Sequence, residues 1–136
     1  MTELRFADVA EGVKAAIAAY VQALDDGRTD DVVATFCADG AIDIAGQGAY
    51  SGHDELRAAY GGWVPRRPQR HLVLNTLVTA WSQDEAAATS DVVLLLLGKE
   101  GWRVQVVGRY DDVLHRDGDA WRFHRRAATF VEPTGA

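Results

Sequence analysis

The periodicity of the chain changes at RHLVLNTLVTAW, residues 70–81. Upstream of it, apolar residues recur at spacings of three and four, which is typical of helices that bury one face. From Arg70 onward the period becomes two, the period of strands. We therefore expect strands at about 69–81, 86–97, 102–116 and 120–131. Helices followed by a meander of long strands predict an α+β fold.

The residues before Arg70 predict three helices. An apolar stripe that includes Val13 and Leu24 marks the first helix, which Gly27 ends. Thr29 can cap the second helix, and Ser51 with Asp54 resembles the capping box of the third. We expect these helices at about 7–26, from 29 to near 40, and 51–62, with a short extended piece at 41–45.

Length and composition are those of one ordinary globular domain, residues 1–136, with its core at about 8–131. Of the 136 residues, 48% are apolar and 25% are charged, so a single buried core is expected. The net charge of −6 argues against a nucleic-acid partner, which would require a basic face. The run 92–97 is too short to span a bilayer, and residues 1–30 do not resemble a signal peptide.

One cysteine, Cys37, excludes an internal disulfide and favours a cytoplasmic location. Its neighbours Val32, Val33 and Phe36 are apolar, so we expect it in the second helix as a buried, inert thiol. The sequence has no Cys/His metal spacing, glycine-rich phosphate loop or nucleophile elbow. We therefore expect no metal and no organic cofactor.

The predicted strand at 86–97 contains VVLLLL, residues 92–97, which is apolar on both faces. A sheet with one face in water should alternate instead. The helices can cover only one face, so the other needs a cover of its own. The sequence therefore predicts a homodimer packed through sheet faces.

Two residues in different elements are candidates for acid/base chemistry. Asp25 falls at the edge of the first helix's apolar stripe, where a carboxylate could face a pocket, whereas Asp26 is nearly opposite the stripe. His71 opens the first long strand and, in a regular strand, shares a face with Asn75. A pocket needs a few convergent polar groups, although each residue alone also fits a structural role.

Aromatic residues supply the remaining candidates. Tyr110 lies in the middle of a predicted strand, and its hydroxyl could donate to a carbonyl oxygen; a core tyrosine with a bonded hydroxyl is the simpler interpretation. Tyr20, Tyr50 and Trp63 are possible pocket walls.

Six motifs stand in order along almost the whole chain. They are YVQALD (20–25), FCADG (36–40), YSGHDEL (50–56), RHLVLN (70–75), GRYDD (108–112) and DGDAWRF (117–123). With these motifs, from about residue 8 to 131, the sequence resembles the SnoaL-like polyketide cyclases of the nuclear transport factor 2-like superfamily. The resemblance implies a cone-shaped α+β barrel, with N-terminal helices packed on a curved antiparallel sheet that encloses a pocket. This fold hosts enzymes of several classes and non-enzymes.

In the scytalone dehydratase-like branch, the resemblance implies that an aspartate on the first helix pairs with a histidine on the first long strand. The matching residues are Asp25 and His71. The second histidine of that branch has no match within 108–112, and the carboxylate base of ketosteroid isomerase-like members has none either. Tyr110 and Asn75 are then the candidate partners from the sheet.

These observations predict a cofactor-free lyase or isomerase, of the dehydratase or cyclase type, acting on a small and largely apolar carbonyl compound. His71 would be the acid/base, Asp25 its orienting partner, and Asn75 or Tyr110 the donor to the carbonyl oxygen. The alternative is a ligand-binding or dimerising accessory domain without chemistry. A third interpretation, a small subunit of an oxygenase, would require a large partner chain.

Overall fold

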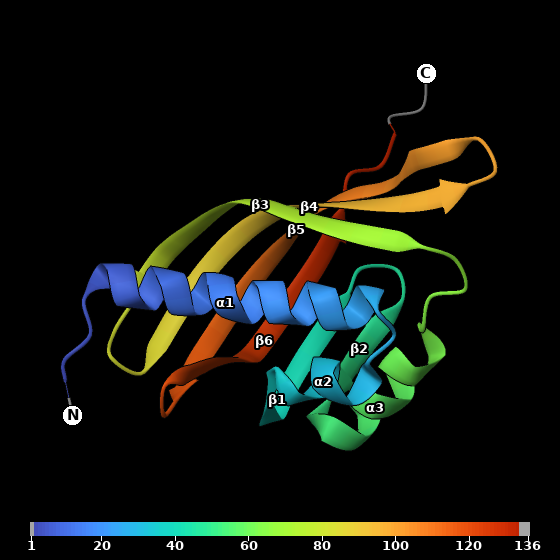
Figure 1. The fold of residues 1–136 in the computed structure, drawn as a ribbon. Coiled ribbons are helices and arrows are strands. Elements are labelled where there is room, and N and C mark those ends of the chain that lie inside the picture. The colour runs from blue at the N-terminus through green and yellow to red at the C-terminus, as the bar shows by residue number, and fades with distance from the viewer. Residues whose placement is uncertain (1, 134–136) are drawn as a thin grey trace.

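A computed structural model of the chain describes residues 2–133. Three helices come almost entirely before the long strands of one sheet, as Figure 1 shows. The elements are α1 (Phe6–Asp25), α2 (Thr29–Ala34), β1 (Phe36–Ile44), β2 (Gly48–Ser51), α3 (Gly52–Gly62), β3 (Gln69–Trp81), β4 (Glu85–Gly98), β5 (Gly101–Asp117) and β6 (Ala120–Phe130). The four strands predicted after residue 69 and the α+β class are therefore confirmed.

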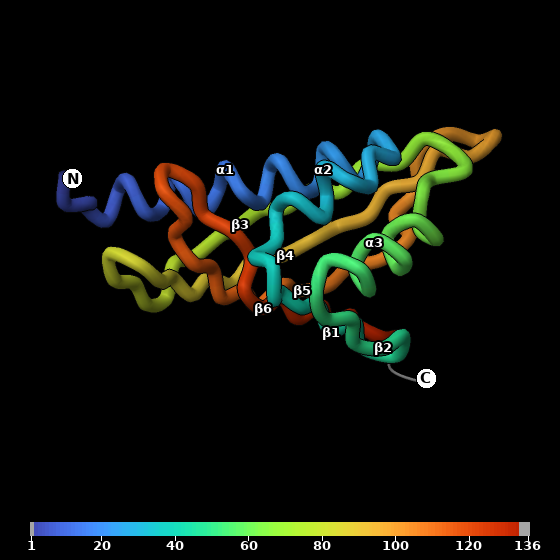
Figure 2. The backbone as a smooth tube through the Cα atoms, turned by 90° about the horizontal axis from the view of Figure 1, so that it is seen from below, coloured from blue at the N-terminus to red at the C-terminus, as the bar shows by residue number. Residues whose placement is uncertain are grey.

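The six strands form one sheet in the order β2-β1-β6-β5-β4-β3. Strands β3 to β6 are an antiparallel meander, but β1 lies parallel to β6 and carries β2 as the outermost strand. The sheet is thus mixed rather than wholly antiparallel. α1 runs along one face of the curved sheet, and α2 and α3 lie at the end formed by β1 and β2 (Figures 1 and 2).

The second helix is shorter than the sequence indicated. It ends at Ala34, and from Phe36 the chain continues as β1. Phe36 pairs with Phe123 of β6, and both side chains are buried, with ring centroids 5.5 Å apart. Pairing with a distant strand overrides the local helical pattern. Cys37 therefore lies on a strand, half-buried, and not in an apolar helix.

The core lies between α1 and the concave face of the sheet. Val9, Val13 and Ile17 of α1 are buried against sheet residues such as Leu114 and Phe123. α1 therefore packs its predicted stripe on the sheet, and its last turn reaches the start of β3. The packing of this one helix determines where Asp25 lies.

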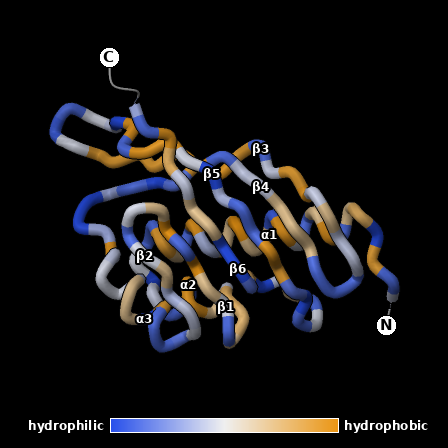
Figure 3. Tube along the Cα trace, turned by 180° about the vertical axis from the view of Figure 1, so that it is seen from behind, coloured by the Kyte–Doolittle hydropathy of each residue, from blue (hydrophilic) through white to orange (hydrophobic). Residues whose placement is uncertain are grey.

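The opposite face of the sheet is rich in exposed apolar side chains, and Figure 3 views the molecule from that side. Leu72, Val93 and Val107 are paired neighbours across β3, β4 and β5. Leu72 is 44% exposed and Val107 is 43% exposed. No described helix covers these residues. None of the helices within residues 2–133 combines the length and apolar character needed to cross a bilayer.

Candidate functional site

Asp25, the last residue of α1, is held by the first residues of β3. The Nδ1 nitrogen of His71 lies 2.6 Å from Asp25 Oδ1, and the backbone N–H of His71 donates to Asp25 Oδ2 at 2.8 Å. Gln69 Nε2 also donates to Oδ1, at 3.1 Å. Because a carboxylate only accepts hydrogen bonds, this contact places the imidazole hydrogen on Nδ1. The second ring nitrogen, Nε2, then keeps a free lone pair.

The pair is largely withdrawn from water. The side chain of Asp25 is 5% exposed and that of His71 is 12% exposed. Burial raises the pKa of the Asp25 carboxyl, but the hydrogen bonds from His71 and Gln69 outweigh it, so this pKa lies below its ordinary value. Asp25 therefore stays ionised at neutral pH and fixes the orientation of the His71 ring.

His71 lines a cavity of about 230 Å³ between α1, α3 and the sheet. Most of the wall is apolar, with Leu24 from α1, Ile42 from β1, Leu94 from β4 and Phe130 from β6 among its residues. The polar groups on the wall are Tyr20, Gln47, Tyr60, Gln69, His71 and Tyr110. A mainly apolar cavity with a few polar groups is typical of a small-molecule site.

Three tyrosine hydroxyls supply most of the remaining polarity. The hydroxyls of Tyr20 and Tyr60 lie 2.5 Å apart and hydrogen-bond to each other. The Tyr110 hydroxyl has no hydrogen-bond partner within residues 2–133, so it is available to a ligand. Burial raises the pKa of Tyr110, and of Tyr20 and Tyr60 as well. These phenols stay protonated and can act as hydrogen-bond donors.

A buried ion pair lies behind the tyrosines. Arg126 of β6 donates through Nε to Asp112 Oδ1 at 2.9 Å, and both side chains are 0% exposed. The Arg126 guanidinium carbon is 3.6 Å from the centroid of the Tyr110 ring and 4.3 Å from that of Tyr20. Burial opposes its charge, yet the neighbouring Asp112 raises the pKa of Arg126 above its ordinary value. A fixed positive charge therefore stands behind the phenol rings.

The structure places most of the candidates from the sequence around this cavity. Tyr20, Trp63, His71 and Tyr110 line it, and Asp25 lies directly behind His71. Tyr50 does not line it, but packs edge-on against Trp63 with ring centroids 5.4 Å apart.

Asn75 points away from the cavity, contrary to the alternation assumed for its strand. The pairing of β3 with β4 gains one extra residue between Leu74 and Leu77, and Asn75 has a φ of 57°. This bulge reverses which residues face inward. Asn75 is exposed and donates to Asp91 Oδ2 at 2.8 Å, while the next residue, Thr76, shares a hydrogen bond with the buried Ser90.

Sequence reasoning missed four residues of the site: Gln47, Tyr60, Gln69 and Arg126. Tyr60 lies four residues after Leu56 on the apolar face of α3, a spacing that signals burial but not a cavity. Gln69 precedes His71 by two residues and shares its face of β3, a signal that could have found it. Arg126 is buried, and no sequence signal marks it, because arginine is rarely buried.

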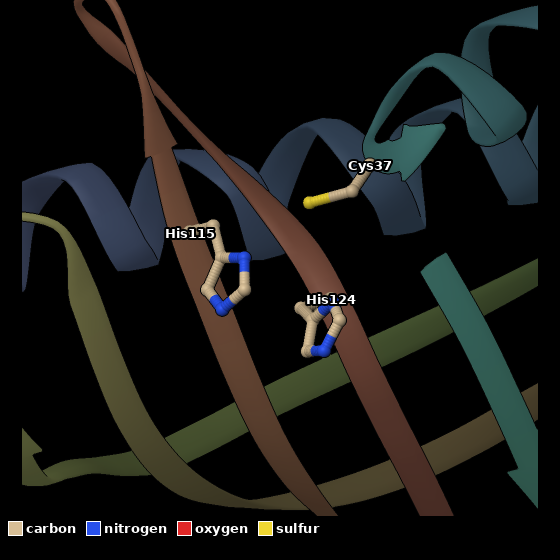
Figure 4. A group of neighbouring side chains, drawn as sticks. All are labelled: Cys37, His115 and His124. Carbon is tan, nitrogen blue, oxygen red and sulfur yellow. The ribbon is translucent and has the colours of Figure 1, made fainter. Parts of the chain in front are cut away.

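A second cluster of polar side chains lies away from the cavity. Cys37 of β1, His115 of β5 and His124 of β6 are the residue types that ligate transition metals, and Figure 4 shows them together. The sequence showed no metal-ligand spacing because these residues come from three separate strands.

Comparisons with known proteins agree with this fold. The family model of the SnoaL-like domain matches residues 6–127. No curated protein matches the chain.

Among solved structures, a protein of unknown function from Mycobacterium tuberculosis is 22% identical, with a TM-score of 0.84 over 91% of this chain and 72% of that one. A putative aromatic ring hydroxylase from Novosphingobium aromaticivorans is 25% identical, with a TM-score of 0.81 over 96% and 93% of the two chains. A putative scytalone dehydratase from the same organism is 19% identical, with a TM-score of 0.79 over 90% and 84%.

The family match spans most of the chain, and the structural likeness covers nine-tenths of it or more. The resemblance seen in the six sequence motifs is therefore confirmed, and this chain belongs to the SnoaL-like domain family.

Proposed function

We propose that the protein is a cofactor-independent lyase or isomerase that acts on a small, largely apolar carbonyl compound. One observation carries the proposal. The imidazole of His71 is fixed through Nδ1 by a buried carboxylate and is part of the wall of a mainly apolar cavity. A histidine held in this way presents Nε2 as a base near neutral pH.

The proposed chemistry begins with removal of a proton next to the substrate carbonyl. Nε2 of His71 takes the proton, and Asp25 stabilises the resulting imidazolium. The Tyr110 hydroxyl, which has no partner within residues 2–133, donates to the carbonyl oxygen as negative charge develops on it. The proton then returns to another carbon, which gives isomerisation, or leaves with a hydroxyl group, which gives dehydration.

Asn75 has no part in this scheme, because its side chain bonds to Asp91 on the surface. The name of the putative scytalone dehydratase among the similar structures agrees with the proposed class, although likeness at 19% identity concerns the fold. The support therefore comes mainly from the site itself.

Proton exchange tests the first chemical step without knowledge of the substrate. The protein is incubated in D₂O with a panel of small cyclic ketones, enones and β-hydroxy ketones, and deuterium next to the carbonyl is followed by NMR. We expect exchange that His71→Gln reduces by about 10²–10⁴-fold, the usual contribution of a positioned base. Tyr110→Phe should reduce it by about 10²–10³-fold, as loss of an oxyanion donor does.

Asp26→Asn is the matched control, since Asp26 neighbours Asp25 but forms an exposed ion pair with Arg28. It should leave the exchange rate unchanged. Exchange that persists in His71→Gln would contradict the proposal. Tight binding of panel members without any exchange would favour the alternative, a ligand-binding domain without chemistry.

A further inference from the structure

Three strands bring a thiol and two imidazoles together at the end of the sheet where β5 turns into β6. One ligand atom from each of Cys37, His115 and His124 lies within 4.8 Å of the other two. Figure 4 shows the three side chains gathered in one group. None of them lines the 230 Å³ cavity that holds His71. The cluster is therefore separate from the proposed catalytic site.

Both imidazoles have a nitrogen that the described protein groups leave unused. His124 Nδ1 is buried and has no hydrogen-bond partner, which is costly for a polar atom. His115 Nε2 lies 3.0 Å from Glu85 Oε2, so the carboxylate places the ring hydrogen on Nε2 and leaves Nδ1 with its lone pair. A carboxylate that orients a ligating histidine in this way is a recurrent outer partner in metal sites.

We propose that Cys37, His115 and His124 bind one zinc ion. One thiolate and two imidazoles form a borderline-soft donor set that suits Zn²⁺. Asp39 Oδ1 lies 3.8 Å from His124 Nδ1, so this exposed carboxylate or a water molecule completes four ligands. Binding transfers the Cys37 thiol proton to solvent, and affinity therefore rises with pH.

A modest movement of the side chains would bring the three ligand atoms to the separations that zinc requires. Ligand atoms around a tetrahedral zinc are separated by about 3.3–3.6 Å, given Zn–S and Zn–N bonds of about 2.3 and 2.0–2.1 Å. The two imidazole rings are stacked, with centroids 4.1 Å apart and planes 14° apart. One ring must turn about χ2 so that the lone pairs converge, and that torsion has a broad, shallow minimum in histidine.

The ion would fasten the start of β1 to the β5–β6 hairpin. Pairing of β1 with β6 is irregular between Phe36 and Ala41, and Cys37 lies inside this interval. Gly40 lies there too, so close to β6 that an added Cβ would be 2.6 Å from the carbonyl oxygen of Phe123. A ligand from each strand would hold this junction together where regular hydrogen bonds do not.

Cobalt gives the most direct test because it reports on the ligands. The full chain is stripped of metal with a chelator and titrated with Co²⁺ and then with Zn²⁺. We expect a thiolate-to-cobalt charge-transfer band and the intense visible bands of tetrahedral cobalt, displaced by one equivalent of Zn²⁺. We also expect zinc to raise the thermal midpoint. Absence of the thiolate band in excess cobalt would overturn the proposal.

Variants then assign the ligands. Cys37→Ser should abolish the thiolate band, and His124→Gln should weaken zinc binding by at least 10-fold. Glu85→Gln should weaken binding by about 10–100-fold while the thiolate band remains, as expected for a positioning residue. Glu85 is exposed and lies outside the core, so its variant keeps the test available if a ligand variant folds poorly.

His71→Gln is the matched control, because it removes a histidine that lies outside the cluster. It should leave zinc affinity and the cobalt spectrum unchanged. Loss of metal binding in His71→Gln, or zinc affinity that Cys37→Ser leaves intact, would show that the ion binds elsewhere and would overturn the proposal.

Discussion

Asp25 stands where an isolated carboxylate is unfavourable, in the last turn of α1, because the negative end of the helix dipole lies there. Three hydrogen bonds from Gln69 and His71 compensate for this position. The residue therefore couples the end of α1 to the start of β3. A mutation there is expected to affect both stability and the orientation of the His71 ring.

The lowered pKa of Asp25 makes part of the protein's stability depend on pH. A carboxyl whose pKa is lower in the folded state stabilises the fold above its unfolded pKa, about 4, and loses that effect as pH falls through the folded pKa. We expect Asp25→Asn to lack this component. Urea unfolding between about pH 6 and pH 2 should then show a smaller loss of stability on acidification than in the wild type. Identical pH profiles would contradict the pairing.

The family resemblance implied the contact of Asp25 with His71, and helical periodicity alone made Asp25 a candidate, but strand alternation placed Asn75 wrongly. Asp25 could be found because helical periodicity is regular over the whole of α1, so the edge of its apolar stripe was visible. The position of Asn75 depended on one extra residue in β3, and strand alternation carries no local mark of such a bulge. Asparagine tolerates the left-handed conformation seen here better than most residues, but many asparagines stand in regular strands.

Among the helices and strands, β6 has most of the features that could not be predicted from the sequence. It pairs in parallel with β1, a strand whose residues were partly assigned to a helix. It also buries Arg126, and no sign of that burial is visible in the sequence. Both errors have one cause, since neither a distant partner strand nor a buried counter-ion such as Asp112 leaves a local periodic signal. The hairpins of β3 to β6 could be predicted because their turns and alternation are local.

The buried ion pair of Asp112 in β5 with Arg126 in β6 predicts how substitutions will change the free energy of unfolding. Arg126→Leu leaves the buried Asp112 carboxylate without its partner, which should lower the free energy of unfolding by about 3–5 kcal/mol. The double variant Arg126→Leu with Asp112→Leu removes both charges and should recover most of that loss. Urea denaturation of the two variants beside the wild type measures the difference. A double variant as unstable as the single one would show that the charge pair is not what matters.

For the whole molecule, the apolar outer face of the sheet is the main unexplained surface. Leu72, Val93 and Val107 form an unbroken row across three strands, and a soluble monomer rarely exposes a continuous apolar patch of this kind. The dimer predicted from residues 92–97 would bury it. We propose that two copies pack through this face.

Val107→Asp tests this proposal, with Val64→Asp as its control. Both valines are 43% exposed, but Val64 lies in the segment after α3, away from the outer face. Light scattering should give twice the 14.8 kDa chain mass for the wild type and for Val64→Asp, and the single mass for Val107→Asp. A wild type of single mass would refute the dimer.

The parallel pairing of β1 with β6 also affects how the protein is made. β1 leaves the ribosome long before its partner exists, because the intervening residues 45–119 take about 4–15 s to synthesise at roughly 5–20 residues per second. Until then the growing chain carries an unpaired edge and cannot close its core. The paired residues lie more than half the length of the chain apart in the sequence, which slows folding. Emergence of β6, rather than emergence of the helices, therefore sets the earliest moment at which the sheet can be completed.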